Sequence, residues 1–278
     1  MQKRTIDVAV VSDVHLGTFA SKAKQFSAYL QSIDPKILIL NGDIIDGWQF
    51  SRRYFPTHHI MAIKEILNLL SNGTKVIYIT GNHDEALRKY ADLELGNFLL
   101  TDKIALEING NKTWIFHGDV FDRTTEQQAR FWGKLGSNGY ALLLAFNRFA
   151  QSIARLFGKR HYSLSEQVMK QFNNRFVKIE AYENKIAAIA IDKKYDTVIC
   201  GHIHKPEKRT ISTERGTVCY LNSGDWMEHS TALEYYDNDW HLFEYKEAEE
   251  PANQPMPHVA RSSVNVITEE LLVYFSSK

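Results

Sequence analysis

Cysteine is scarce in this chain, and neither sign of charge predominates. Two cysteines among 278 residues are too few for a disulfide framework, which indicates a reducing compartment. The 33 basic and 33 acidic side chains balance, so no overall field attracts nucleic acid or another polyanion. No apolar run approaches the roughly 20 residues of a membrane-spanning helix, and the first residues lack the apolar core of a secretory signal. We therefore expect a cytoplasmic protein that does not bind nucleic acid.

Short apolar runs that end in glycine and polar residues are the main feature that is present. The run Ile37–Leu40 has no polar interruption, which is typical of a strand covered on both faces. It stops at Asn41-Gly42-Asp43, and similar runs cover 6–11, 75–79, 113–116 and 197–200. Open α/β sheets bind ligands just beyond the carboxyl ends of their strands. The pattern therefore predicts an α/β fold with a site at the strand ends.

Helical patterns separate the early strands and dominate the middle of the chain. Helices are expected at 22–33 and 58–71, and 124–194 has a wholly helical pattern. Further strands are expected around 218–221, 231–236 and 240–245, followed by a stretch rich in proline and acidic residues. We predict one domain over 1–246 with a helical insertion at about 124–194, then a linker and C-terminal tail over 247–278.

The expected strand ends carry five short motifs built from metal-ligand residue types. They are Asp13-Val14-His15, Gly42-Asp43, Gly81-Asn82-His83-Asp84, His117-Gly118 and Gly201-His202-Ile203-His204. Carboxylate, imidazole and amide donors suit Mn, Fe, Zn or Mg, whereas a closed structural zinc site would usually include thiolates. One such motif alone is most often a surface turn, but several in register at strand ends indicate a metal site. Two metals that share a carboxylate can hold a hydroxide and neutralise phosphoryl oxygens during in-line displacement.

The order and spacing of these motifs resemble the calcineurin-like metallophosphoesterase superfamily, with its pattern D-x-H, G-D-x-x-D, G-N-H-D/E, H-G and G-H-x-H. The resemblance spans Asp13 to His204 and implies a four-layer α/β/β/α sandwich holding two divalent metal ions, with manganese favoured over Fe, Zn or Mg. It implies that one metal is bound by Asp13, His15, Asp43 and His204, and the other by Asp43, Asn82, His117 and His202. It also implies that His83 contacts the phosphoryl group and protonates the leaving group, while Asp46 orients His83.

Within the superfamily, the start Ser-Asp-x-His-Leu-Gly and the helical insertion resemble the UDP-2,3-diacylglucosamine diphosphatases of lipid A biosynthesis. Those enzymes release UMP and a diacylated glucosamine 1-phosphate, usually with manganese, and their insertion forms a lid over the acyl chains. The chain departs from them at His83, where they have arginine, and at Phe121–Thr125, where they carry Cys-Thr-Asp-Asp. A related but different diphosphate or phosphoester substrate is therefore an alternative.

The sequence offers two candidate regions for substrate contacts. Residues 140–157 are apolar on more than one side, and Arg148 and Arg155 fall at helical spacing beside them. An apolar body with a basic flank suits a lipid tail with its anionic headgroup, or a membrane surface, although plain core packing gives the same stripe. Arg52 and Arg53 lie in an aromatic loop that could contact phosphate or base, or could simply be solvated.

Three classes of function follow from these observations. The favoured class is a dimetal hydrolase for a lipid-linked nucleotide diphosphate, in peripheral contact with the cytoplasmic face of the inner membrane. The second is a phosphodiesterase or phosphatase for a soluble nucleotide-type substrate, and the third is a non-catalytic scaffold on the same fold. A protein phosphatase is disfavoured because that branch has Arg-Gly after the residue equivalent to Asp46, where this chain has Gly47-Trp48.

Overall fold

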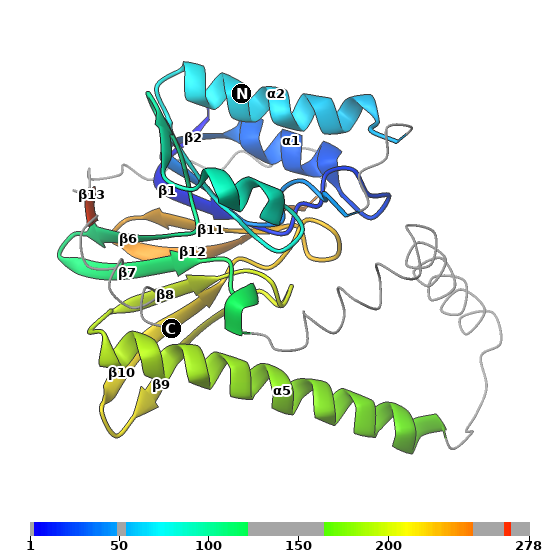
Figure 1. Ribbon diagram of the computed structural model, residues 1–278, viewed down its shortest axis with the longest axis vertical. Helices are drawn as coiled ribbons and strands as arrows, with labels where there is room; N and C mark the ends of the chain where they lie inside the picture. Colours follow the sequence, from blue (N-terminus) through cyan, green and yellow to red (C-terminus); the bar gives the residue numbers. More distant parts are fainter. Residues whose placement is uncertain (1–2, 49–53, 122–163, 247–263, 268–278) are drawn as a thin grey trace. The chain divides into compact units, whose positions relative to one another are not determined.

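A computed structural model describes residues 3–48, 54–121, 164–246 and 264–267 (Figure 1). The chain divides into two compact units, one formed by 1–119 with 187–278 and the other by 120–186. The second unit contributes the start of a long helix, α5 (Leu164–Asp192), to the described part of the chain. The expected site residues that the structure describes all belong to the first unit.

The first unit contains a seven-stranded sheet in the order β12-β11-β1-β2-β3-β5-β4. Its strands are β1 (Arg4–Val11), β2 (Ile33–Asn41), β3 (Lys75–Ile79), β4 (Leu93–Leu95), β5 (Phe98–Thr101), β11 (Thr231–Tyr236) and β12 (Asp239–Glu244). The neighbours β1, β2, β3 and β5 run parallel, while β4, β11 and β12 pair antiparallel at the edges. The carboxyl ends of β1, β2 and β3 consequently meet at one edge of this sheet.

The same unit contains a six-stranded sheet in the order β13-β6-β7-β8-β10-β9. Its strands are β6 (Lys103–Ile108), β7 (Asn111–Phe116), β8 (Thr197–Cys200), β9 (Glu207–Thr213), β10 (Gly216–Asn222) and β13 (Val264–Ile267). The central strands β7, β8 and β10 run parallel to one another. This sheet therefore also presents three adjacent carboxyl ends.

Alternate residues of the central strands face two different cores. Val8 and Val10 of β1 belong to a cluster that includes Ile115 and Ile199 of the second sheet, so this cluster lies between the sheets. Ala9 of β1 and its neighbours on the opposite face belong to a second cluster shared with the helices. Burial on both faces explains why these strands appear in the sequence as unbroken apolar runs.

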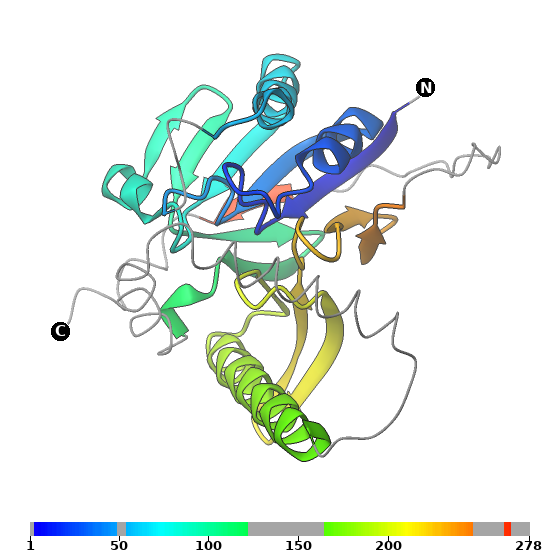
Figure 2. The ribbon, with the colours of Figure 1, turned by 90° about the vertical axis from the view of Figure 1, so that its right-hand side faces the viewer.

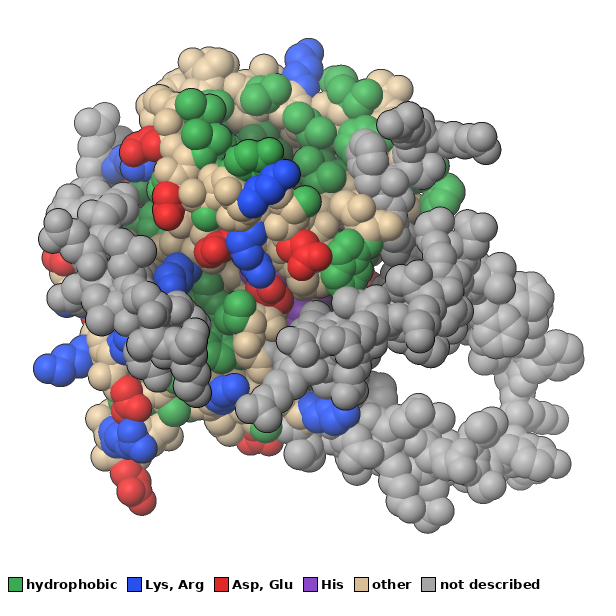
Figure 3. All heavy atoms as spheres, viewed as in Figure 1, with side chains coloured by type: hydrophobic (Ala, Val, Ile, Leu, Met, Phe, Trp, Pro, Cys, Tyr) green, Lys and Arg blue, Asp and Glu red, His purple; other side chains and the backbone are tan. Residues whose placement is uncertain are grey.

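Two helices cover the outer face of the seven-stranded sheet (Figure 2). They are α1 (Ala23–Ser32) and α2 (Thr57–Ser71), and short 3-10 turns follow at η1 (Glu85–Tyr90) and η2 (Asp119–Phe121). Helix α2 also exposes Ile60, Met61 and Leu67, and the space-filling view shows hydrophobic side chains gathered on the face that carries these helices (Figure 3). The last turns of α5 lie against the other sheet, because a Cβ at Gly216 of β10 would be 3.2 Å from Ile191.

The predicted α/β class with two stacked sheets is confirmed, and the expected strands at 6–11, 75–79, 113–116 and 197–200 are present. The sequence analysis missed β4, β5, β9 and β13. Residues of β4 are exposed throughout, and β9 is polar at most positions, so neither carries the apolar signal of a central strand. The predicted lid falls largely on 122–163, outside the described residues, and stays a prediction together with the domain boundaries. Within the described part of the chain, no helix combines the length and apolarity that crossing a membrane would require.

Candidate metal centre

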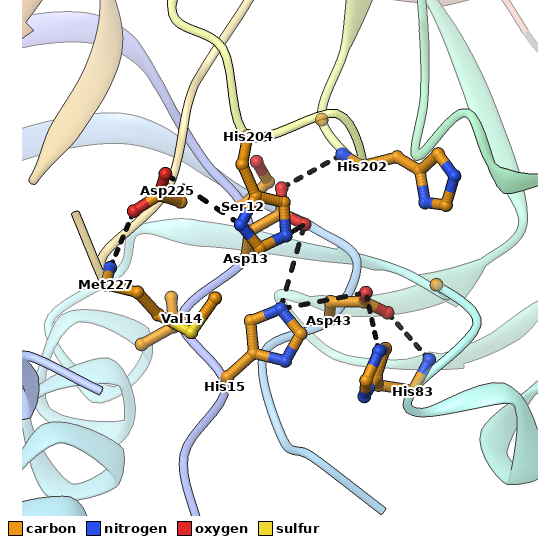
Figure 4. A network of polar contacts seen from close by, with 12 residues as sticks. Ser12, Asp13, Val14, His15, Asp43, His83, His202, His204, Asp225 and Met227 are labelled. Atoms are coloured by element: carbon orange, nitrogen blue, oxygen red, sulfur yellow. Dashed lines mark hydrogen bonds and ion pairs between the residues drawn. The ribbon is translucent and has the colours of Figure 1, made fainter. Parts of the chain in front are cut away.

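The carboxyl ends of β1, β2 and β3 in one sheet and of β7 and β8 in the other bring the predicted ligand residues together (Figure 4). The segment after β1 carries a carboxylate and the imidazole of His15, and the segment after β2 carries the second carboxylate. The segments after β3, β7 and β8 carry the amide and the other imidazoles. The residues that converge in this way are Asp13, His15, Asp43, Asn82, His83, His117, His202 and His204. We refer to this group as the strand-end cluster.

The buried carboxylate of Asp43 lies at the centre of the strand-end cluster. Its Oδ2 is 3.3 Å from Nε2 of His117, 3.9 Å from Nε2 of His15 and 4.0 Å from Nε2 of His83. Its Oδ1 accepts a hydrogen bond of 2.8 Å from the backbone N–H of His83. One oxygen is thus fixed by the backbone while the other faces three imidazoles, as a carboxylate shared between two ions would require.

Asp13 organises one side of the cluster. Its Oδ1 lies 3.1 Å from Nε2 of His204 and 3.9 Å from Nε2 of His15. Its Oδ2 accepts the backbone N–H of His202 at 3.0 Å. The first strand's carboxylate is therefore tied to the loop after β8, and the ligand atoms of Asp13, His15 and His204 lie within 4.8 Å of one another.

The other side of the cluster contains His117, Asn82 and His202. Nδ1 of His117 donates to the carbonyl oxygen of Asn41 at 2.9 Å, which directs Nε2 toward Asp43. Nδ1 of His202 lies 3.1 Å from Oδ1 of Asn82. The ligand atoms of Asp13, Asp43 and His117 form another group within 4.8 Å, and those of His15, Asp43 and His83 form a third.

Several residues of the cluster adopt left-handed backbone conformations. The φ angles are +53° at Asp13, +50° at His15, +54° at Asp43, +66° at His202 and +55° at His204. Such conformations are uncommon for residues other than glycine and carry a cost in conformational energy. Because so many of them occur here, the surrounding structure must stabilise these conformations, which direct the side chains toward one point.

The glycines of the motifs leave room for the side chains of the cluster. A Cβ at Gly201 would lie 2.6 Å from Oδ2 of Asp13, and one at Gly81 would lie 2.6 Å from the backbone nitrogen of Asp43. Both distances are too short for any real side chain. Glycine is therefore needed at these positions because the carboxylates pass so close to the backbone.

The buried polar atoms of the cluster fit bound cations. Oδ1 of Asp13, Nε2 of His15 and Nε2 of His117 are buried and form no well-aligned hydrogen bond among the described residues, and the groups nearest to them are other ligand atoms of the cluster. Buried polar atoms are rarely left without a partner because their desolvation is costly. Oxygen and imidazole nitrogen donors suit the divalent ions that the sequence predicts, so the donor set fits a metal centre.

The charges within the cluster reinforce one another. Burial alone would raise the pKa of Asp13, but the imidazoles of His204 and His117 hold it at about 2. The pKa of Asp43 is likewise held well below its usual value, mainly by His117. Burial opposes charging of His117, yet Asp43 raises the pKa of this imidazole well above its usual value. The carboxylates are thus ionised at neutral pH, and a divalent cation would compete with protons for their charge.

His83 and Asp46 form a pair beside the cluster. Nδ1 of His83 lies 3.0 Å from Oδ2 of Asp46, and the same oxygen is 3.3 Å from Nδ1 of His15. The backbone N–H of Trp48 donates to Oδ1 of Asp46 at 3.0 Å. The Trp48 ring packs against the ring of His83 at a tilt of 31°, with centroids 4.1 Å apart. Burial lowers the pKa of His83, but the bond to Asp46 and the charge of Asp43 raise it overall.

The sequence analysis missed two residues near the cluster. Trp48 was noted only as a difference from protein phosphatases, and nothing in the sequence places its ring on His83. Asp225 follows β10 in a Gly224-Asp225 pair, the same signal that identified Gly42-Asp43 after β2. The predicted substrate residues Arg52, Arg53, Arg148 and Arg155 lie outside the described residues.

Comparison with known proteins gives consistent results. The profile of the calcineurin-like phosphoesterases matches residues 6–206. The UDP-2,3-diacylglucosamine hydrolase of Aliivibrio fischeri is 23% identical over 239 residues, covering 84% of this chain and 97% of the relative. That of Porphyromonas gingivalis is 27% identical over 244 residues, covering 79% of this chain and 90% of the relative.

Among solved structures, an archaeal phosphodiesterase aligns with a TM-score of 0.38 at 15% identity, covering 85% of this chain and 98% of that one. This distant likeness adds nothing to the assignment. The family profile, by contrast, spans most of the chain and includes every motif of the strand-end cluster. The chain therefore belongs to the calcineurin-like phosphoesterase family.

Proposed function

We propose that this metallophosphoesterase cleaves the diphosphate linkage of UDP-2,3-diacylglucosamine or of a closely similar lipid-linked nucleotide. The observation that carries the proposal is the convergence of Asp13, Asp43 and the surrounding imidazoles on one point, with the His83–Asp46 pair beside it. The relatives named UDP-2,3-diacylglucosamine hydrolase match over most of this chain and most of their own length, which supports this substrate class.

Asp13, His15, Asp43 and His204 would hold one divalent ion, and Asp43, Asn82, His117 and His202 would hold the second. When bound, such ions supply a hydroxide nucleophile and neutralise the charge of the phosphoryl oxygens. Manganese is the ion that we propose. The contribution of the protein is to keep its ligands ionised and aimed inward, as the lowered pKa values of Asp13 and Asp43 favour.

His83 would act on the leaving group. Its raised pKa favours the protonated imidazole, which can donate to a phosphoryl oxygen or to the departing oxygen. Asp46 faces Nδ1, so Nε2 is the atom left to meet the substrate. The Trp48 ring limits the rotation of His83 and shields one face of the imidazole from water.

The proposed lipid contact rests on the helical insertion of about 124–194. Within it, Arg148 and Arg155 would pair with anionic groups, and Arg52 and Arg53 would contact phosphate or base. A substrate with two acyl chains resides in a membrane, so we propose a cytoplasmic protein in peripheral contact with the inner membrane. A flotation assay with vesicles containing anionic lipid tests this contact.

A second candidate is a phosphodiesterase for a soluble nucleotide-type substrate. The observation that favours it is His83, which stands where the lipid A branch has arginine. The imidazole lies 3.0 Å from Asp46 and packs against the tilted ring of Trp48, so it has less reach than a guanidinium. A shorter side chain whose positive charge is balanced by Asp46 would suit a substrate with less negative charge at this position than one bound by arginine.

One experiment separates the two candidates. Purified protein loaded with Mn²⁺ is given UDP-diacylglucosamine in mixed micelles and, in parallel, bis-p-nitrophenyl phosphate, with UMP release followed by chromatography. We expect UMP release with a kcat/KM far above that for the small diester. Turnover of the small diester alone would favour the soluble substrate, and turnover of neither would contradict both.

A further inference from the structure

Asp225 is a fully buried carboxylate at the end of β10 that none of the metal motifs contains. Its Oδ1 accepts the backbone N–H groups of Met227 at 2.7 Å, Glu228 at 2.5 Å and His229 at 3.2 Å. Burial would raise the pKa of Asp225, but these bonds and the nearby imidazoles lower it below its usual value. One oxygen is thus fully committed to the backbone, and the carboxylate has a single orientation.

The other oxygen of Asp225 faces two imidazoles, and Figure 4 shows the one of His204. Oδ2 accepts from Nδ1 of His229 at 2.7 Å and lies 3.8 Å from Nδ1 of His204. On the opposite edge of the same ring, Nε2 of His204 lies 3.1 Å from Oδ1 of Asp13. The His204 ring therefore stands between two carboxylates, one inside the strand-end cluster and one behind it.

The segment that carries Asp225 is bonded to the loop that carries Asp13. The Trp226 N–H donates to the carbonyl oxygen of Asp13 at 3.1 Å. The hydroxyl of Ser12 lies 2.7 Å from that of Ser223 and donates to the carbonyl oxygen of Gly224 at 3.0 Å. The two carboxylates on either side of His204 are consequently held at a fixed separation.

We propose that Asp225 is a positioning residue for His204: its carboxylate accepts the Nδ1 proton and thereby leaves Nε2 bare toward the metal that Asp13 and His15 bind. Histidines that ligate metals usually donate their other ring nitrogen to a carboxylate or carbonyl, which fixes the tautomer. The 3.8 Å separation is a charge contact, and a ring displacement of about 1 Å would make it a hydrogen bond. The oxygen can accept from both imidazoles because a carboxylate oxygen has two lone pairs.

This inference rests on the proposed metal centre and makes a claim about one of its two sites. Asp225→Asn tests it with almost no change in shape. The amide oxygen can replace Oδ1 for the three backbone N–H groups, while the NH₂ group would then face Nδ1 of His204. Nδ1 would have to accept, the proton would move to Nε2, and His204 could no longer ligate.

The measurement is the number of Mn²⁺ ions per chain and their dissociation constants, obtained by metal analysis and titration calorimetry. We expect the wild-type protein to bind two ions. We expect Asp225→Asn to bind one ion with unchanged affinity and the second with an affinity at least tenfold lower, which is the typical effect of removing the hydrogen-bond partner of a metal-ligating histidine. His229→Asn is the matched control, because it removes the other imidazole from Oδ2 and leaves His204 facing the carboxylate. It should bind two ions normally.

The outcomes separate this inference from the metal centre itself. Fewer than two ions in the wild-type protein would contradict the metal centre. Two tightly bound ions in both wild type and Asp225→Asn would contradict the role of Asp225 alone, as would equal weakening in the His229→Asn control. Equal weakening of both ions in Asp225→Asn would also contradict it, because that result means general loosening of the fold.

A second measurement applies if Asp225→Asn does not fold. In wild-type protein loaded with Zn²⁺, ¹⁵N NMR of the imidazoles should show a slowly exchanging Nδ1–H that disappears in His204→Gln. Asp225→Ser, which can still accept backbone N–H groups but cannot reach His204, should remove the slow exchange. A His204 Nδ1–H that exchanges freely in the wild-type protein would overturn the proposal.

Discussion

Nδ1 of His83 lies 3.0 Å from Oδ2 of Asp46, and this contact turns the opposite nitrogen of the ring toward Asp43. The contact also contributes to the raised pKa of His83. A histidine held in this way can supply a proton, and the groups Asp13–His15–His204 and Asp13–Asp43–His117 place metal-ligand atoms close together without it. The roles of His83 and of the ligands are therefore separable by mutation.

His83→Ala should keep both metals and lose most of its turnover. We expect kcat to fall by roughly a hundredfold or more, the usual effect of removing a general acid or a donor to the phosphoryl oxygens. Metal content by elemental analysis and kcat on a phosphodiester substrate check this result. Loss of a metal ion in the variant would make His83 a ligand and contradict the assigned roles.

Asp43→Ala should behave in the opposite way. Its carboxylate is the group that faces His15, His83 and His117 together, so its removal takes a ligand from both ions at once. We expect loss of at least one metal per chain and of nearly all activity, measured on the purified variant after dialysis against Mn²⁺. Two ions per chain with normal turnover would rule out a shared carboxylate.

Gly81→Ala tests whether close backbone packing shapes the metal centre. A Cβ at this position would lie 2.6 Å from the backbone nitrogen of Asp43, so Asp43 must shift, and we expect weakened Mn²⁺ binding. Gly73→Ala is the matched control: its φ is +98° and no atom lies within 4 Å of the added Cβ. The control should cost about 1 kcal/mol of stability through its backbone conformation and leave Mn²⁺ affinity unchanged. Equal Mn²⁺ affinity in both variants would contradict this account.

The sequence predicted the central strands and the residues that meet at their ends because both depend on local patterns. Apolar runs buried on two faces were visible at 37–40 and 75–79, and each ended in a glycine beside a ligand type. The site required only the further rule that parallel strands present their carboxyl ends together. Asp13, Asp43 and His117 were therefore predictable as a group before their separation was known.

Features that depend on three-dimensional packing were not predictable. The left-handed conformation of His15 and the packing of the Trp48 ring against His83 arise from contacts between segments distant in the sequence. Asp225 was overlooked although a strand was expected at 218–221, because it stands several residues beyond that strand and belongs to none of the five motifs. The edge strand β4 is exposed along its length, so burial left no signal in its sequence.

His59 links helix α2 to the loop that carries His15, and this link should make stability depend on pH. The ring is fully buried, and Nδ1 accepts the backbone N–H of Gly17 at 2.8 Å. A bond to an N–H requires an unprotonated Nδ1. Burial, with a smaller contribution from the neighbouring His58, lowers the pKa of His59 from 6.5 to about 4.

The sign of the pH effect follows from this lowered pKa. The unfolded chain binds a proton at His59 below about pH 6.5, whereas the folded protein resists it until about pH 4, so stability is full above this window and falls as the pH drops through it. At pH 5 the loss should be about 2 kcal/mol of unfolding free energy.

The variant His59→Asn tests this effect. Its amide oxygen takes the place of Nδ1 as acceptor for the Gly17 N–H, and the amide does not titrate. Urea unfolding of the chelator-treated protein at pH 7 and pH 5 should show the wild type losing about 2 kcal/mol more than the variant. Comparing the two proteins cancels the titration of all other groups, and equal losses would show that folding does not lower the pKa of His59.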